Sequence, residues 1–298
     1  MNCALIGTSK IAEVHLLELI KIGAKKIVII SRNINRGKNL CEKYKYKFPN
    51  VNFCYSNKKI LKEKRFDLID ICTSNSTHDL YLKYINKSNN IILVEKPIIS
   101  LKKFKSNYKK ILDQIYKKNN RLLVCYPMTY LAKKFKKYFN SKKKYNTFDF
   151  IFHTGGRYNK ENINIDLMPH ALSFISSFFS NKMLYKNLKI NNITVKKNKW
   201  VSKFSLDNIN FLFDLSEKNK SKTSLTIKYN KKKIIRNTKI INNLFLNILI
   251  YKNKVNKIEN PMTEFFEDLK KNKNSKIFYE KNKKLTYQIM NTNYKFLI

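Results

Sequence analysis

The chain has 298 residues, of which 43% are hydrophobic, and a formal net charge of +42. This length is comfortable for two domains that each bury a core. No apolar run approaches the roughly 20 residues that cross a bilayer, and the N-terminus leads straight into a strand, so we expect a cytoplasmic protein. The five cysteines form no C-x-x-C pair, which indicates buried thiols in a reducing compartment and no metal site.

The positive charge by itself suggests nucleic acid or an anionic membrane as a partner. The lysines, however, are spread over nearly every expected surface and accompany many Asn and Ile and only five Gly, as in AT-rich coding. No helix-turn-helix, zinc finger or RNP-like motif occurs with the charge. We therefore expect no nucleic-acid and no membrane partner, and a nucleic-acid-associated protein remains the alternative that rests on charge alone.

Strands and helices are expected to alternate from residue 2 to about residue 125. Helical periodicity, as in Ile11, Val14, Leu17 and Ile20, lies between short apolar runs. This alternation predicts an α/β fold, with a doubly wound parallel Rossmann sheet in a dinucleotide-binding domain over residues 1–125. The expected strands are 2–7, 26–30, 51–55, 67–72, 91–94 and 121–125.

The first strand ends in the turn Gly7-Thr8-Ser9-Lys10-Ile11-Ala12, a variant of the G-x-G-x-x-G/A dinucleotide motif. Gly7 supplies the tight turn and Ala12 the close packing of helix on strand. Ser9 stands at the second glycine, where its side chain is either accommodated or donates its hydroxyl to a phosphate; an ordinary βα turn is the alternative. The candidate cofactor contacts in this turn are Gly7, Thr8, Ser9, Lys10 and Ile11.

The second strand ends where a carboxylate normally binds the ribose 2′-hydroxyl of NAD. No Asp or Glu occurs between Glu18 and Glu42, and Ser31, Arg32 and Arg36 take that place. A hydroxyl beside a guanidinium suits the extra 2′-phosphate of NADP. The sequence therefore predicts NADP(H) as the favoured cofactor, with NAD(H) as the alternative.

Two further strands end in polar side chains. Thr73, Ser74, Asn75 and His78 follow the strand at 67–72, and small hydroxyl and amide groups there can line a cofactor. Thr77 is a candidate cap for the next helix. Lys96 follows Ile91–Val94, at the edge of an open α/β sheet where ligands bind, although one more surface lysine is the alternative.

After Tyr126 the pattern changes to closely spaced strands, which predicts a second, α+β domain over residues 126–298 with a large, mostly antiparallel open sheet. Its open face makes a homodimer or tetramer plausible. Helices are expected near 129–139 and 166–179, from Pro261, and after about residue 280. The expected strands are 147–154, 187–195, 199–205, 208–215, 222–229 and 232–240.

The order of these features resembles the Gfo/Idh/MocA oxidoreductase family, whose members use NAD(P) on sugars, cyclitols and related polyols. Three stretches carry the resemblance: the Gly7 turn followed by His15, the turn from Thr73 to His78 leading to Glu95-Lys96-Pro97, and Asp166-x-x-x-His170.

The resemblance implies a sugar-like substrate and three catalytic residues. Lys96 would orient the substrate oxygen and stabilise alkoxide charge, His170 would exchange its proton, and Asp166 would orient that imidazole or bind a hydroxyl. It also places Glu95, Lys96 and Pro97 beside the cofactor, often with a cis proline, and packs His15 and His78 near the cofactor turn.

Several positions depart from the family pattern. Ser9 replaces a glycine, Ser74 stands where a proline is usual, and Asn162-Ile163-Asn164 replaces a glycine-rich segment. These departures leave a second hypothesis open, a nucleotide-binding member with reduced or no activity that acts as a binding protein.

Overall fold

The computed structural model describes residues 1–85, 90–139, 146–156, 158–179, 187–219, 222–241 and 244–297. They form two compact units. The first unit comprises Met1–Cys125 and Phe265–Tyr287, and the second comprises Tyr126–Glu264 and Gln288–Ile298. A single boundary after residue 125 would assign residues 265–287 to the second domain, but this segment lies in the first unit.

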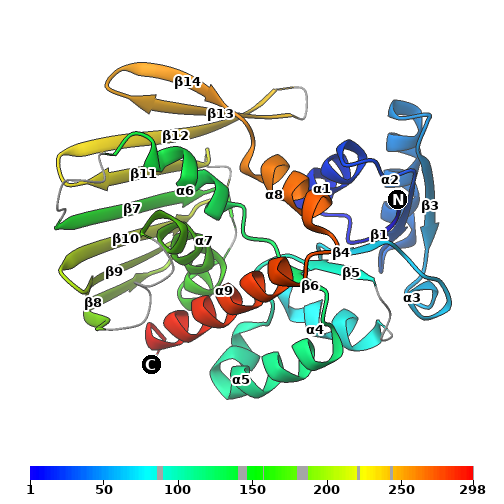
Figure 1. Ribbon diagram of the computed structural model, residues 1–298, viewed down its shortest axis with the longest axis horizontal. Helices are drawn as coiled ribbons and strands as arrows, with labels where there is room; N and C mark the ends of the chain where they lie inside the picture. The colour runs from blue at the N-terminus through cyan, green and yellow to red at the C-terminus, as the bar shows by residue number, and fades with distance from the viewer. Residues whose placement is uncertain are drawn as a thin grey trace. The chain divides into compact units, whose positions relative to one another are not determined.

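The first unit is built on a six-stranded parallel sheet in the order β3-β2-β1-β4-β5-β6. Helices α1 and α2 lie on one side of the sheet, and α4 and α5 on the other (Figure 1). This confirms the predicted doubly wound α/β architecture. The strands are β1 (Asn2–Ile6), β2 (Lys26–Ile30), β3 (Asn52–Ser56), β4 (Leu68–Ile71), β5 (Ile91–Val94) and β6 (Leu122–Val124), and the helices are α1 (Lys10–Lys21), α2 (Ile34–Lys47), α3 (Ile60–Glu63), α4 (Asn75–Tyr84) and α5 (Leu101–Lys118).

The central strands of this sheet end level with one another. Ile6 pairs with Ile30 on one side and with Ile71 on the other, and Ile71 pairs with Val94. The residues that follow β1, β2, β4 and β5 therefore lie along one edge of the sheet, which we call the carboxyl edge. The opposite edge, where the same strands begin, is the amino edge.

The second unit contains an eight-stranded sheet in the order β14-β13-β12-β11-β7-β10-β9-β8. All neighbouring strands are antiparallel except β7 and β10, which are parallel. The mostly antiparallel α+β prediction is thus confirmed. The strands are β7 (Thr147–Thr154), β8 (Lys189–Lys196), β9 (Lys199–Leu206), β10 (Ile209–Glu217), β11 (Ser224–Tyr229), β12 (Lys232–Ile241), β13 (Leu244–Tyr251) and β14 (Lys254–Ile258).

One face of this sheet packs on α7 (Glu161–Phe179) through aromatic side chains. The ring of Phe174 lies 5.5 Å from that of Phe150 and edge-on to it, and Phe150 packs in turn on Phe213. Helix α6 (Met128–Lys136) packs against α7, with the ring of Phe135 edge-on to that of Phe174. These four phenylalanines are fully buried and form the core of the unit.

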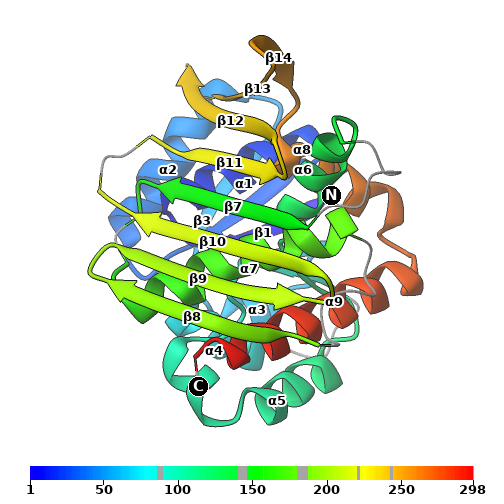
Figure 2. The same ribbon diagram turned by 90° about the vertical axis from the view of Figure 1, so that its left-hand side faces the viewer.

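The other face of the sheet is the one turned to the viewer in Figure 2. Its central strands present half-buried apolar side chains such as Ile151, Val201 and Leu212. A homo-oligomer that covers this face stays a prediction, which sedimentation of the full chain would test. A monomer at micromolar concentration would contradict it.

Two strands and several helix boundaries differ from expectation. The strands β13 and β14 lie in a stretch for which the sequence predicted no strand, and α7 begins at Glu161 rather than near residue 166. Two more helices, α8 (Pro261–Asn272) and α9 (Lys276–Lys295), close the chain. Among the helices of the described ranges, none is long and apolar enough to cross a bilayer.

Candidate functional site

The turn after β1 depends on Gly7. Its φ of +126° lies in the region that favours glycine, and a Cβ built there would lie 2.7 Å from the backbone oxygen of Cys72. The Gly7 N–H donates to the Ile30 oxygen at 2.9 Å. Gly7 is therefore needed both for the bend and for the close approach of β4.

Ser9 takes the place of the second glycine without strain, because its φ of −82° and ψ of 169° suit any L-residue. Its Oγ caps α1 by accepting the Ala12 N–H at 3.4 Å, and it lies 3.4 Å from the Cys72 oxygen, to which it donates. The hydroxyl thus serves the protein itself. Lys10 and Ile11 supply the first two backbone N–H groups of α1, the kind of donors that bind phosphate at a helix N-terminus.

Ser31, Arg32 and Arg36 follow β2 at the same edge. Ser31 Oγ accepts the Asn33 N–H at 3.2 Å, and Asn33 caps α2 by accepting the Arg36 N–H at 2.9 Å. Both arginine side chains are exposed. These residues fit an anionic group at the end of β2 and offer no carboxylate for a ribose diol.

The turn after β4 is held by the buried His78. Its Nδ1 lies 2.9 Å from the Pro97 oxygen and its Nε2 lies 2.9 Å from the Thr73 oxygen, so the ring joins the turns that follow β4 and β5. Thr73 accepts from the hydroxyl of Thr77 at 2.9 Å. Ser74, not Thr77, occupies the N-cap position of α4, because the helix begins at Asn75.

Lys96 lies directly after β5, and the Lys96–Pro97 peptide bond is cis. All residues from Ile91 to Ile99 are buried except Lys96, which is partly exposed. Its backbone N–H donates to Glu95 Oε2 at 3.1 Å. The local packing therefore fixes the backbone of this lysine while its side chain reaches the surface at the carboxyl edge.

Beneath Lys96 lies a buried ionic network. His15 Nδ1 contacts Asp70 Oδ2 at 2.9 Å, and His15 Nε2 contacts Glu95 Oε1 at 2.9 Å. Since both ring nitrogens face carboxylates, the ring is an imidazolium that donates twice. Both oxygens of Glu95 are thus engaged inside the protein, where Oε1 contacts His15 and Oε2 accepts the Lys96 N–H. The place of Glu95 beside the cofactor stays a prediction.

The charges of this network shift both pKa values. Burial alone would lower the pKa of His15, but the Asp70 carboxylate outweighs it and raises that pKa well above the usual value. Burial likewise opposes ionisation of Glu95, but the hydrogen bond and positive charge of His15 lower the pKa of that carboxyl. Each partner therefore holds the other in its charged form.

The second unit holds Asp166 and His170 on α7. They are four residues apart and hence on one face of the helix, and both are partly exposed although most of α7 is buried. The His170 ring packs edge-on against Phe152 of β7, with 5.5 Å between ring centroids. The helix thus presents a carboxylate and an imidazole together on its accessible side.

Comparison with known proteins supports a dinucleotide-binding fold for the first unit. Residues 1–126 match the model of the Gfo/Idh/MocA oxidoreductase family with an NAD-binding Rossmann fold. No curated protein sequence matches the chain.

Several solved structures share the fold over nearly the whole chain. The 3-ketoreductase KijD10 from Actinomadura kijaniata, in complex with NADP, has a TM-score of 0.69 at 9% identity, covering 97% of this chain and 94% of its own. The dehydrogenase MviM from Clostridium difficile has a TM-score of 0.65 at 14% identity, covering 100% and 98%. The UDP-N-acetylglucosamine 3-dehydrogenase GnnA from Acidithiobacillus ferrooxidans has a TM-score of 0.64 at 11% identity, covering 98% and 95%. Residues 1–126, which contain the Gly7 turn and the Glu95-Lys96-Pro97 turn, thus match the NAD-binding Rossmann domain of the Gfo/Idh/MocA oxidoreductase family, and the chain shares its fold with solved dehydrogenases and ketoreductases.

Proposed function

We propose that the protein is an NADP(H)-preferring dehydrogenase or reductase that acts on a sugar-like alcohol or ketone. The observation that carries this proposal is Lys96, a partly exposed cation at the carboxyl edge of a family Rossmann sheet, whose backbone is fixed by Glu95. In such sheets ligands bind beside the carboxyl ends of the strands. An ammonium group there suits a substrate oxygen that gains negative charge.

The residues have separate roles in this proposal. The bound nicotinamide cofactor supplies or accepts the hydride. Lys96 orients the substrate oxygen and stabilises alkoxide charge, while His170 exchanges the hydroxyl proton as general acid or base. Imidazole is the side chain best suited to proton exchange near neutral pH. Asp166, one helical turn before His170, orients that ring or binds a substrate hydroxyl.

A second candidate function is a nucleotide-binding protein without turnover. One observation favours it: α7 begins at Glu161, so that Asn162-Ile163-Asn164 is helical where the family pattern has a glycine-rich segment. The binding and turnover measurements below separate the two candidates, since a binding protein retains nucleotide affinity but transfers no hydride.

A hydride-transfer screen tests the proposed function. Nucleotide sugars, polyols, aldoses and their keto forms are offered with NADP⁺ or NADPH, and absorbance at the nicotinamide band is followed. We expect turnover with at least one sugar-like substrate and none with simple aliphatic alcohols, which have the reacting hydroxyl but lack the further hydroxyls that Asp166 would bind. NADPH binding without turnover on the full panel would support the binding protein instead.

Cofactor preference is testable at the end of β2. NADPH should bind more tightly than NADH, and Arg32→Ala should weaken NADPH binding by about tenfold or more, because a charge-assisted hydrogen bond to phosphate contributes roughly 1.5–3 kcal/mol. NADH affinity should stay within about twofold. Fluorescence titration measures both constants. Lys38→Ala, which removes an exposed cation from the neighbouring helix α2, is the control. Tighter binding of NADH by the unaltered chain would refute the preference.

A further inference from the structure

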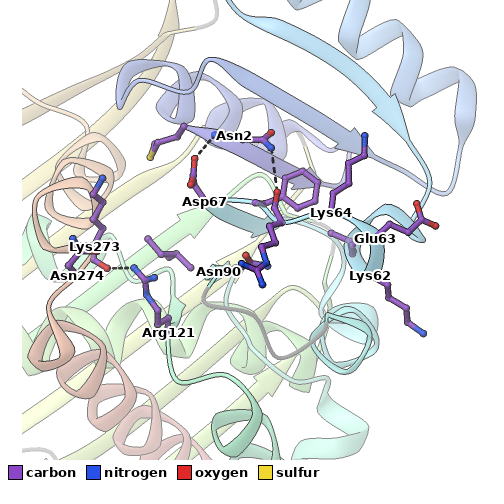
Figure 3. A pocket seen from close by; sticks show the side chains of 14 residues that line it. Asn2, Lys62, Glu63, Lys64, Asp67, Asn90, Arg121, Lys273 and Asn274 are labelled. Atoms are coloured by element: carbon purple, nitrogen blue, oxygen red, sulfur yellow. Dashed lines mark hydrogen bonds between the residues drawn. The ribbon is translucent and has the colours of Figure 1, made fainter.

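A cavity of about 870 Å³ lies at the amino edge of the six-stranded sheet in the first unit (Figure 3). Its lining includes Asn2 at the start of β1, Ile91 at the start of β5 and Arg121 just before β6. Because all six strands are parallel, this edge is opposite to the one that carries Gly7 and Lys96. The cavity is therefore distinct from the candidate dinucleotide site.

The cavity is lined by more positive than negative side chains. Five Lys and Arg residues line it against two carboxylates, and the Asp67 carboxylate already accepts the Asn2 N–H at 2.7 Å. Figure 3 shows cations on two sides of the cavity. Lys62 and Lys64 lie on one side, in α3 and the segment that follows it, and Arg121 and Lys273 lie on the other, just before β6 and in the turn between α8 and α9. A concave surface with cations on several sides concentrates a positive field. The charged lining residues are Lys62, Glu63, Lys64, Arg65, Asp67, Arg121 and Lys273.

The arginines set this cavity apart from the lysine background of the chain. The sequence has only six arginines among 62 Lys+Arg residues, and two of them, Arg65 and Arg121, line this one cavity. Two others, Arg32 and Arg36, stand at the proposed phosphate site after β2. Arginine binds phosphate through a rigid fork of donors, which a lysine does not offer. General lysine enrichment does not account for two arginines meeting here.

Arg121 is held in place before any ligand arrives. Its guanidinium donates to the backbone oxygen of Lys273 and lies 5.7 Å from the ring centroid of Tyr279. Lys273 lies in the turn between α8 and α9, Tyr279 lies on α9, and both belong to the first unit. A donor fork already fixed by the protein loses less conformational freedom on binding an anion than a mobile side chain would.

The remaining lining suits an organic ligand more than a bare ion. Leu61, Phe66 and Ile91 contribute apolar surface to the cavity wall. The volume is within the range of about 300–1,000 Å³ that is typical of small-molecule sites.

From these features we propose that the amino-edge cavity binds a second phosphorylated small molecule of nucleotide size. Its phosphates contact the arginines and lysines, and its organic part lies against the apolar wall. The site is independent of hydride transfer, so the chain would bind this ligand and the dinucleotide together.

Calorimetric titration with ATP as the probe, at about 150 mM salt, tests the proposal. We expect one ATP to bind per chain when NADPH is saturating, and adenosine to bind at least tenfold more weakly. In the variant R65E/K273E, which changes two exposed side chains at the cavity, ATP affinity should fall at least tenfold. The control K254E/K257E makes the same charge change on exposed residues of β14 and should stay within twofold.

Three results would overturn the proposal: no ATP binding by the unaltered chain, equal loss in both double variants, or adenosine binding as tightly as ATP. A failure of NADPH to bind would count against the proposed oxidoreductase function alone. The difference in ATP affinity between R65E/K273E and its control would still report on the amino-edge cavity, because both residues lie away from the carboxyl edge.

Discussion

Replacing Lys96 by Met should lower kcat by about a hundredfold to a thousandfold, the usual cost of removing one donor that stabilises a developing oxyanion. Methionine keeps an unbranched chain of similar length and removes only the charge and the donors. The Lys96 backbone should stay in place, since its N–H, which Met also has, is held by Glu95 at 3.1 Å. The NADPH dissociation constant should therefore change by less than about threefold.

The measurement pairs steady-state turnover on the substrate found by screening with a fluorescence titration of NADPH. Lys102→Met is the matched control, because Lys102 is an exposed lysine six residues further on, in the first turn of α5. It should leave kcat within about twofold of the unaltered chain. Turnover by Lys96→Met at the original rate would show that Lys96 is one more surface lysine. Loss of turnover together with loss of NADPH binding would assign Lys96 to the cofactor site only.

The sequence was most informative where one local pattern decides the structure. Short apolar runs such as Ile91–Val94 are typical of strands buried on both faces, and their alternation with helices predicted a doubly wound parallel sheet. Alternating Phe148, Phe150 and Phe152 similarly defined β7, whose bounds match the expected 147–154. These patterns are local, and a residue's immediate neighbours are enough to recognise them.

Contacts between residues far apart in the sequence could not be predicted from such local patterns. The strand β13 reads Leu-Phe-Leu-Asn-Ile-Leu-Ile-Tyr, an apolar run without period-two alternation, and β14 is polar and exposed, so neither resembled a half-buried strand. The parallel pairing of β7 with β10 joins residues that lie far apart along the chain, such as Thr147 and Asn210, and has no local signature. His15 lies 55 residues from Asp70 and 80 from Glu95. The available signal was Asp70 itself, a carboxylate inside an otherwise apolar strand that must find a partner.

His15→Gln should destabilise the protein by about 3–5 kcal/mol near pH 6, because it leaves the Asp70 and Glu95 carboxylates buried without their shared cation. Asp70 is fully buried and Glu95 is 7% exposed. Glutamine has roughly the size of histidine but no charge, so it cannot compensate for the desolvation of two carboxylates. Urea denaturation followed by circular dichroism gives the unfolding free energies.

His153→Gln is the matched control. His153 is partly exposed on β7 and its Nε2 lies 3.9 Å from Asp214 Oδ1, a pair that water screens. Its replacement should change the unfolding free energy by less than about 0.5 kcal/mol. A similar small change for His15→Gln would mean that the buried ring is neutral and that the carboxylates are stabilised in another way.

The pH dependence distinguishes an ionic network from simple packing at His15. Its pKa is raised by folding, so its contribution to stability is complete below the usual value of 6.5 and is lost as pH rises through the folded pKa. The pKa of Glu95 is lowered by folding, so its contribution is present above the usual 4.5 and is lost as pH falls through the folded value. The stability difference between the unaltered chain and His15→Gln should thus be largest between about pH 4.5 and 6.5 and narrow toward pH 9. A difference that stays constant from pH 5 to 9 would show that His15 contributes shape alone. If the difference in unfolding free energy narrows toward pH 9, the charges of His15, Asp70 and Glu95 stabilise the fold as well as fix the position of Glu95 beside Lys96.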